Sequence, residues 1–520
     1  MRSVAQALVE WLKSMGTEVV FGIPGVHTIE LYRALPGSGI RHVTPRHEQG
    51  AGFMADGYAR VSGRFGVALV ITGPGLTNML TPMAQARADS VPMLVISGVN
   101  ARKTLGKGLG FLHELPDQLA LSTTLGPAFQ LGDAPQLPDI LRQAGTALTN
   151  GRGGPVHIEI PLDLMAAPCP LAPTAEPVER PHPPAERPPA ALEAARARLQ
   201  GAKAPVILAG GGCRQANGAL RALAEALDAP VILTTNARGL LHGHPLVVPA
   251  SPSLEPVRTL IRESDALLVA GSELGPTDCD MYGLGDFPDI SAMIRLDIDA
   301  AQLARHPAAL TLQGDAAALL PALTVARPAH DGAARAAAAR DGARAALPDP
   351  YQGEVALLER LRRLYPGAIM VGDSTQIIYA GNLYHDHDRP GGWFNAATGY
   401  GALGYATGAA VGAALAAPKA RVLCLIGDGG LMFSPGEVLT AVQERLDITF
   451  IVFNNHGFGE IAAAMREAGA EVLGCTPAPP DFEAFARACG LPFTRCTPET
   501  MPQPAGPGPR MIEVRLPPVQ

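Results

Sequence analysis

Short apolar runs alternate with amphipathic helical stretches along the whole chain. Examples of the apolar runs are VVFGIPG, GVALVITGPG, PVILAGGG, ALLVAG, RVLCLIGDGG and ITFIVFNN. They have the length and aliphatic composition of strands that are buried on both faces. Strands that alternate with helices favour parallel sheets with helices packed on both faces. The pattern therefore predicts an α/β fold built from parallel sheets.

Two stretches interrupt this pattern and read as linkers. Residues 166–190 are crowded with proline, and residues 326–350 are rich in alanine and arginine with little apolar periodicity. Such segments are typical of domain boundaries, although the second also has the composition of a solvated helix. We therefore expect three parallel-sheet α/β domains, over residues 1–165, 190–325 and 350–520.

Composition argues against several partners and locations. The formal net charge of the 520-residue chain is -7 and no basic run is present, so nothing favours nucleic acid as a partner. The first residues, MRSVAQALVEWLKSMG, are amphipathic rather than signal-like, and no apolar stretch has the length of a membrane span. Seven cysteines without a CxxC pair are typical of a reduced protein. We expect a cytoplasmic protein.

The strongest chemical signal follows the apolar run at residues 422–426. The residues at the end of that strand are Gly427, Asp428, Gly429 and Gly430. The next apolar strand ends at Asn455, and the carboxyl ends of neighbouring parallel strands form a ligand-binding edge. Asp428 and Asn455 offer the hard oxygen ligands that Mg²⁺ takes together with phosphate oxygens, and the glycines let backbone N–H groups approach a diphosphate. GDGG alone would also suit an ordinary turn. Ser434, Pro435 and Glu437 then have the pattern of a helix start, with Ser434 as N-cap.

This arrangement resembles the thiamine diphosphate (ThDP)-dependent enzymes, in which GDG after one strand and NN after the next mark the diphosphate-binding domain. The resemblance implies ThDP as cofactor, with its diphosphate at the glycines around Asp428. It also implies Mg²⁺ bound by the side chains of Asp428 and Asn455 and by the backbone carbonyl of Gly457.

Residues 44–60, TPRHEQGAGFMADGYAR, resemble the pyrimidine-binding motif of the same family. The resemblance places Glu48 against N1′ of the aminopyrimidine. A carboxyl hydrogen-bonded there favours the imino tautomer, which removes the proton from C2 of the thiazolium. An acid that only stabilises a helix N-terminus would look the same in isolation.

Two glycine-rich segments extend the resemblance. Residues 397–415 resemble the segment beside the pyrimidine ring, which implies that the carbonyl of Gly401 and the amide of Leu403 bind the ring and that the Leu403 side chain supports the bent cofactor. A plain glycine- and alanine-rich packing helix would have a similar sequence. Residues 72–78, which include Gly73, resemble the loop over the reacting end of the cofactor.

The resemblance covers essentially the whole chain, in the order pyrimidine-binding, central and diphosphate-binding domain. Family members form each active site from two subunits, which implies a homodimer or homotetramer. Some acetolactate synthase-type members carry a flavin (FAD) in the central domain. The GGG at residues 210–212 is too weak a signal to predict one.

Two histidines distinguish the chain from acetolactate synthases. His27 stands where synthases have a small residue, and a histidine at this place in carboligase and lyase relatives relays protons to the substrate oxygen. His113 stands in the segment 105–118, near the position of a synthase glutamine. We predict both as catalytic, although a packed, structural histidine is the alternative at position 27.

Four further residues are predicted to border the substrate: Glu114, Asp117, Glu460 and Ile461. A carboxylate buried in this pocket without a partner would be costly, and the guanidinium of a substrate tail would relieve that cost. The alternative for each acid is a solvated surface group or a helix cap.

The chain resembles most specifically the 5-guanidino-2-oxopentanoate decarboxylases of bacterial arginine catabolism. This implies non-oxidative decarboxylation of that 2-oxo acid to 4-guanidinobutanal and CO₂. Acetolactate synthase-like carboligation, or another ThDP-dependent C–C lyase reaction, is the alternative. A noncatalytic ThDP-binding paralogue is a third hypothesis, and the presence of Glu48 argues against it.

Overall fold

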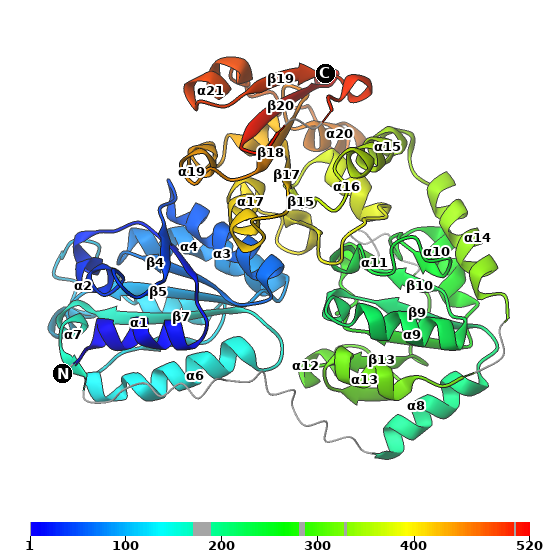
Figure 1. Cartoon of the computed structure of the whole chain (residues 1–520), viewed down its shortest axis with the longest axis horizontal. Helices are drawn as coiled ribbons and strands as arrows, with labels where there is room; N and C mark the ends of the chain where they lie inside the picture. The colour runs from blue at the N-terminus through cyan, green and yellow to red at the C-terminus, as the bar shows by residue number, and fades with distance from the viewer. Residues whose placement is uncertain (1, 170–188, 280–286, 327–329, 504–505, 520) are drawn as a thin grey trace.

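Three six-stranded sheets with flanking helices make up the computed structural model (Figure 1). It describes residues 2–169, 189–279, 287–326, 330–503 and 506–519. Every strand pair within the three sheets is parallel. The predicted α/β fold with three parallel sheets is therefore confirmed.

The N-terminal sheet has the strand order β3-β2-β4-β5-β7-β6. Its strands are β2 (Val19–Gly22), β3 (Arg41–Val43), β4 (Gly66–Val70), β5 (Met93–Val99), β6 (Ala128–Gln130) and β7 (Pro155–Pro161). Its helices are α1 (Val4–Ser14), α2 (Ile29–Arg33), α3 (Glu48–Ser62), α4 (Pro74–Ala88), α5 (Gln118–Thr123), α6 (Leu137–Thr149) and α7 (Leu162–Met165). A short antiparallel pair, β1 (Arg2–Ser3) with β8 (Pro168–Cys169), joins the two ends of this domain.

The central sheet has the strand order β11-β10-β9-β12-β13-β14, so strands are added on one side of β9 up to β11 and on its other side from β12 onward. Its strands are β9 (Pro205–Ala209), β10 (Val231–Leu233), β11 (Val247–Val248), β12 (Ala266–Ala270), β13 (Ile294–Asp297) and β14 (Leu310–Gln313). Its helices are α8 (Pro189–Gly201), α9 (Asn217–Leu227), α10 (Glu255–Arg262), α11 (Pro276–Cys279), α12 (Ala300–Leu303), α13 (Ala316–Leu323) and α14 (Gly332–Ala345).

Helix α14 lies inside the stretch 326–350 that we interpreted as a linker. Its residues Ala336, Ala339 and Ala343 are buried in one hydrophobic cluster with residues of β9 and β12. This part of the chain is therefore packed against the central domain. Most of the other predicted linker, residues 170–188, lies outside the described residues.

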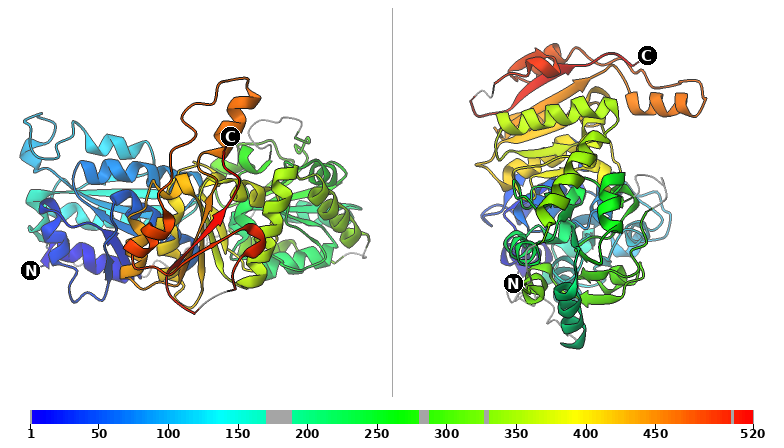
Figure 2. Two further views of the ribbon diagram at one scale, coloured as in Figure 1. Left: turned by 90° about the horizontal axis from the view of Figure 1, so that it is seen from above. Right: turned by 90° about the vertical axis from the view of Figure 1, so that its right-hand side faces the viewer.

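The C-terminal sheet has the strand order β16-β15-β17-β18-β20-β19. Its strands are β15 (Ile369–Gly372), β16 (Trp393–Asn395), β17 (Val422–Gly427), β18 (Ile448–Asn454), β19 (Phe493–Cys496) and β20 (Arg510–Arg515). Its helices are α15 (Asp349–Leu364), α16 (Gln376–Leu383), α17 (Tyr405–Ala416), α18 (Asp428–Leu431), α19 (Glu437–Gln443), α20 (Gly459–Glu467) and α21 (Phe482–Ala488). This domain lies above the other two in Figure 1, and Figure 2 shows it from two further directions.

Helices α3 and α17 join the N-terminal and C-terminal domains at a very close crossing. A Cβ atom on Gly57 would lie 2.0 Å from the carbonyl oxygen of Ala409, and one on Gly412 would lie 1.9 Å from that of Met54. Only glycine permits such an approach of two backbones. The largest hydrophobic cluster accordingly contains residues of both domains. All seven cysteines are buried.

Glu437 strengthens the same junction. The helix expected to begin with Ser434 as its N-cap begins instead at Glu437, so that prediction was wrong. The Glu437 carboxylate accepts hydrogen bonds from the backbone N–H groups of Arg46 and His47, at 3.0 and 3.2 Å, directly ahead of α3. The acid therefore ties α19 to the backbone that leads into α3, while His47 is the N-cap of α3 itself.

Candidate active site

The carboxyl ends of β17 and β18 bring together the three residues predicted to hold Mg²⁺. The two strands are neighbours, with Gly427 opposite Phe453. Asp428 follows β17 as the first residue of α18 and is only 2% exposed. Asn455 follows β18, and its side-chain oxygen accepts the N–H of Gly457 at 3.3 Å. These residues therefore leave one edge of the sheet together.

The surroundings of Asp428 suit a cation. Burial raises the pKa of its carboxyl, and the backbone N–H of Gly429 offsets part of that rise. A divalent cation would favour the ionised form. In the part of the chain that the structure describes, no three His, Cys, Asp or Glu side chains gather as a metal site. A metal here would depend on one carboxylate with amide, carbonyl and phosphate oxygens, which is the donor set that Mg²⁺ accepts.

Two residues that the sequence analysis did not identify border the predicted diphosphate site. Ser374 and Thr375 follow β15, the strand beside β17. The Ser374 hydroxyl is buried, and among the described residues it has no hydrogen-bond partner. A Cβ on Gly427 would lie 3.3 Å from the Thr375 hydroxyl, and one on Gly429 would lie 2.4 Å from the ring of Phe458. The site thus offers glycine backbone and an unpaired hydroxyl, which fit a diphosphate.

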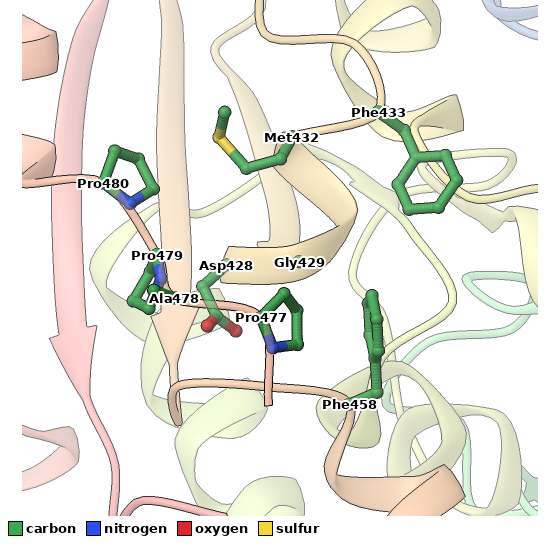
Figure 3. Close-up of a pocket in the computed structure, with 9 residues that line it drawn as sticks. All are labelled: Asp428, Gly429, Met432, Phe433, Phe458, Pro477, Ala478, Pro479 and Pro480. Carbon is green, nitrogen blue, oxygen red and sulfur yellow. The ribbon is translucent and has the colours of Figure 1, made fainter. Parts of the chain in front are cut away.

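A pocket of about 530 Å³ opens beside Asp428 (Figure 3). It is lined by Asp428, Gly429, Met432, Phe433, Phe458, Pro477, Ala478, Pro479 and Pro480. The Asp428 carboxylate points from the start of α18 toward the segment that carries Pro477 (Figure 3). All the lining residues belong to the C-terminal domain, so Glu48 and the two predicted catalytic histidines are not among them.

The segment predicted to bind the pyrimidine ring precedes α17. Gly401 has a left-handed backbone, with φ of 76°, and Leu403 is half-buried. The Asp373 carboxylate accepts the N–H groups of Gly404 and Ala406 at 3.2 and 3.0 Å, and a Cβ on Gly430 would lie 3.1 Å from it. Asp373 therefore ties the start of α17 to the glycines of the diphosphate site.

Glu48 is the first residue of α3 and is half-buried. Its carboxylate accepts a hydrogen bond of 2.9 Å from the side-chain amide of Asn78, in α4. The two motifs assigned to the pyrimidine-binding domain, residues 44–60 and 72–78, are thus in direct contact.

His27, Gly73 and His113 also lie together in this domain. The ring centroids of His27 and His113 are 5.3 Å apart, in an edge-to-face arrangement. A Cβ on Gly73 would lie 2.5 Å from the carbonyl oxygen of His113. Nδ1 of His27 is buried and has no hydrogen-bond partner among the described residues. The structure therefore pairs the two histidines that the sequence analysis identified separately.

Glu114 and Asp117 each use their carboxylates locally. Glu114 accepts the backbone N–H groups of Leu109 and Phe111, at 3.2 and 2.9 Å. Asp117 is the N-cap of α5 and accepts the N–H of Ala120 at 2.9 Å. These bonds match the alternative of a local cap.

Glu460 has a different environment. It is half-buried in the first turn of α20. The Tyr351 hydroxyl donates a hydrogen bond of 3.4 Å to its carboxylate. Its charge also acts on Glu354, whose pKa is raised to about 8 by burial first and by Glu460 second. Oε2 of Glu354 is buried and unpaired among the described residues. Ile461, the next residue of α20, is 55% exposed.

A second cleft, of about 740 Å³, lies at the carboxyl ends of the central strands. Gly211 and Gly212 border it, and a Cβ on the preceding Gly210 would lie 2.2 Å from the carbonyl oxygen of Gly271. This is the edge where parallel sheets bind ligands. The glycines alone still do not support a flavin, and a yellow colour of the purified protein would be the test.

Three family profiles match the chain in the order of its domains. They are the N-terminal TPP binding domain of thiamine pyrophosphate enzymes over residues 2–121, the central domain over 192–323 and the C-terminal TPP binding domain over 373–505. The chain belongs to the thiamine pyrophosphate enzyme family. Since thiamine pyrophosphate is ThDP, the matches confirm the family and support the predicted cofactor.

Several curated relatives cover nearly the whole chain. It is 44% identical over 499 residues to the probable 2-ketoarginine decarboxylase of Pseudomonas aeruginosa, which covers 94% of this chain and 88% of the relative. It is 31% identical over 535 residues to the acetolactate synthase isozyme 1 large subunit of Escherichia coli, with 98% and 93% covered. It is 30% identical over 526 residues to the acetolactate synthase large subunit of Mycobacterium tuberculosis, with 95% and 83% covered.

No helix among the described residues is both long enough and apolar enough to cross a membrane.

Proposed function

We propose that this ThDP enzyme decarboxylates 5-guanidino-2-oxopentanoate, with Mg²⁺ holding the diphosphate, and releases 4-guanidinobutanal and CO₂. The observation that carries the proposal is the 44% identity, over 94% of the chain, to a protein named for 2-ketoarginine, which is the same compound. The buried Asp428 beside the glycines supports the metal. The acetolactate synthase relatives favour carboligation of pyruvate as the second candidate.

Bound ThDP would supply the electron sink that lets the bond to the carboxylate break. Glu48 would hold a proton at N1′ of the cofactor, with Asn78 orienting its carboxylate. His27 and His113 would hold or release a proton at the substrate oxygen. Asp428, Asn455 and the carbonyl of Gly457 would bind Mg²⁺.

Glu460 is the best candidate to bind the cationic tail. The carboxylates of Glu114 and Asp117 already accept backbone hydrogen bonds. Among the described residues, Glu460 accepts a single long hydrogen bond, of 3.4 Å, from the Tyr351 hydroxyl. It stands two residues after Phe458, which lines the pocket beside Asp428. Proximity to this pocket is what we expect of a group that binds the substrate tail.

Glu354 would complete the tail site. Oε2 of Glu354 is buried and has no hydrogen-bond partner in the described part of the chain, and Glu460 is close enough for the two charges to interact. No salt bridge to either acid is found among the described residues. A guanidinium offers several donors in one plane and can bind two carboxylates at once. Its positive charge would favour the ionised form of both acids. Sequence reasoning missed Glu354 because it lies in α15, far along the chain from every motif.

We propose that the enzyme is a homodimer or homotetramer. The pocket beside Asp428 takes no residue from the N-terminal domain of its own chain, although the family's chemistry needs Glu48. Large apolar side chains are exposed near both halves of the site: Val26, Ile29, Leu109, Phe111 and Leu112 in the N-terminal domain, and Tyr400, Met432, Phe433 and Ile461 in the C-terminal domain. A second copy would cover such surfaces and bring the halves together.

A panel of 2-oxo acids with ThDP and Mg²⁺ tests the substrate. We expect 5-guanidino-2-oxopentanoate to exceed pyruvate by roughly 10- to 150-fold in kcat/KM, which corresponds to about 1.5–3 kcal/mol for a charge-assisted pair. Glu460→Gln should remove most of this preference and Glu354→Gln part of it, while turnover of pyruvate changes little. Asp117→Asn is the matched control and should keep the preference.

The products decide between the two candidates. Release of 4-guanidinobutanal supports decarboxylation, and formation of acetolactate from pyruvate supports carboligation. Equal efficiency with pyruvate, or an unchanged preference in both Glu460→Gln and Glu354→Gln, would contradict the cationic-tail hypothesis.

A further inference from the structure

Glu114 forms several hydrogen bonds within its own loop, between β5 and α5. One carboxylate oxygen of Glu114 accepts the N–H of Leu109 and the other accepts that of Phe111, while the N–H of Glu114 donates to the carbonyl of Phe111 at 3.0 Å. Desolvation raises the pKa of this carboxyl, but the N–H groups of Phe111 and Leu109 together bring it below its usual range. The ionised acid therefore acts as a clamp on the loop 109–114.

His113 needs such a clamp because its backbone is in an unfavourable conformation. Its φ is 62°, in the left-handed region, which is unfavourable for residues other than glycine. Two contacts besides the clamp hold the loop. The Asn100 side chain donates to the carbonyl of Leu112 at 3.1 Å, and Gly73 leaves space for the carbonyl of His113.

The clamp fixes the ring of His113 against His27. The two rings lie edge to face, with an angle of 85° between their planes. His27 belongs to a short turn of helix, Val26–Thr28, and its buried Nδ1 is without a partner among the described residues. Burial lowers the pKa of His27, and the neighbouring His113 lowers it further. His113 therefore influences the protonation of His27.

We propose that Glu114 is a positioning residue that holds His113 against His27, and that the two imidazoles act as a pair on the substrate oxygen. This rests on the proposed function, since that oxygen belongs to a 2-oxo acid. The pair gives a proton to the oxygen when the carbonyl becomes a hydroxyl, and takes the proton back when the aldehyde forms. The pair is thus regenerated in each turnover.

Histidine titrations by NMR on the full-length protein test the arrangement without substrate or cofactor. The imidazole carbons would be labelled with ¹³C, and His27→Gln and His113→Gln would assign the two signals. We expect the pKa of His27 to rise toward its ordinary value, about 6.5, both in His113→Gln and in Glu114→Gln. Asp117→Asn, which removes the neighbouring acid that caps α5, should leave it unchanged.

Kinetics provide the second readout. Glu114→Gln should lower kcat/KM by about 10-fold, less than the 10²-fold or more expected for loss of a positioned proton donor in His113→Gln. Any limb of the pH profile that follows His27 should move to higher pH in both variants. Asp139→Asn, at an exposed acid of α6 in the same domain, should keep the original profile. Asn100→Ala, which removes another hold on the loop, should change the His27 titration in the same direction.

Two results would overturn the proposal. If His113→Gln changes the His27 titration but neither Glu114→Gln nor Asn100→Ala does, the clamp does not position His113. If His113→Gln also leaves it unchanged, the rings do not act as a pair. The titration uses no substrate, so its outcome does not depend on which 2-oxo acid the enzyme accepts. Conversely, an unchanged His27 titration would contradict the role of Glu114 without bearing on the substrate preference.

Discussion

The N-terminal and C-terminal domains have the same strand order but carry different chemistry. Numbered along each domain, both sheets run second, first, third, fourth, sixth and fifth. The helices that follow the second strands, α3 and α17, pack against each other. Yet one domain places Asp428 and Asn455 at its ligand-binding edge, and the other places Glu48 and two histidines near its own. Both domains therefore have a ligand-binding edge at the carboxyl ends of their strands, and the residues that follow each strand determine the chemistry there.

The ends of the third strands show this difference most directly. After β17, the chain passes at once to Asp428, a buried acid. After β4, it passes to Gly73, whose N–H donates to the side chain of Gln118 at 2.8 Å and which leaves room for His113. The same place in the fold is thus a proposed metal site in one domain and the support of a histidine in the other.

Removing the acid of the C-terminal domain should have the largest effect. Asp428→Ala deletes the only charged ligand proposed for Mg²⁺. Loss of a residue that merely supports a metal ligand typically lowers affinity by roughly 10–100-fold, so we expect the affinity for ThDP to fall by more than this. Isothermal titration calorimetry with Mg²⁺ present measures this affinity. Glu471→Ala, at an exposed acid of the same domain, is the control. Unchanged affinity in Asp428→Ala would remove the metal assignment.

Removing Glu48 from the N-terminal domain should leave ThDP binding intact but slow the loss of the C2 proton of ThDP. Glu48→Gln keeps the size of the side chain but loses the exchangeable proton, so exchange of the C2 proton of ThDP should slow by about 10²–10⁴-fold. NMR after acid quench follows this exchange. Glu30→Gln, on the surface of the same domain, should exchange at the original rate. Exchange at the original rate in Glu48→Gln would end the proposed role.

Separating α3 from α17 should damage both domains together. The added methyl group of Gly57→Ala would meet the backbone of Ala409, and we expect about 2–3 kcal/mol lower free energy of unfolding. Chemical denaturation measures the change. Gly218→Ala, in α9, is the matched control, because nothing lies within 4 Å of its added atom. Equal effects of both substitutions would show that the crossing tolerates a side chain.

Lowering the pH should destabilise the N-terminal domain through His157, and this is the smallest of the four predicted effects. His157 is buried in β7 between the hydroxyls of Ser97 and Ser122, and burial lowers its pKa to about 3. The unfolded chain binds this proton near pH 6.5, so stability is full above that value and declines as pH falls toward 3. Between pH 7 and 5, His157 should contribute a loss of up to roughly 2 kcal/mol.

Denaturation curves at the two pH values test this contribution. His157→Gln removes the titrating group and should show a smaller loss of stability between pH 7 and 5 than the original protein. An identical loss in the variant would mean that other groups dominate. His244→Gln, at a histidine that pairs with Glu225 in the central domain, is the control.

The strands were predictable where both faces are apolar. The runs that became β17 and β18 are almost uninterrupted apolar sequences, so their pattern is visible in the chain. Strand β7 was not predicted, because His157 and Glu159 interrupt its apolar residues although both are buried. Their partners, such as Gln118, come from other segments. Helix α14 was taken for a linker because alanine gives only a weak hydrophobic signal.

The candidate site was predictable where a motif is local. Asp428 and Asn455 stand at the ends of two recognisable strands, whereas Glu354 and Ser374 enter the site only through packing. The role of Glu114 could not be predicted, since the sequence does not show that a loop will turn its own N–H groups toward that carboxylate. The pairing of His27 with His113 likewise depends on a contact between distant segments.

The burial of every cysteine makes this protein convenient for spectroscopic labelling. Burial raises the pKa of Cys213 to about 12 and that of Cys496 to about 11, so at neutral pH these thiols resist alkylating reagents. A cysteine introduced at Lys107, an exposed residue of the same segment, would be an accessible thiol in an otherwise unmodified chain. A spin label there would report movement of the loop that carries His113, with no native cysteine to remove first.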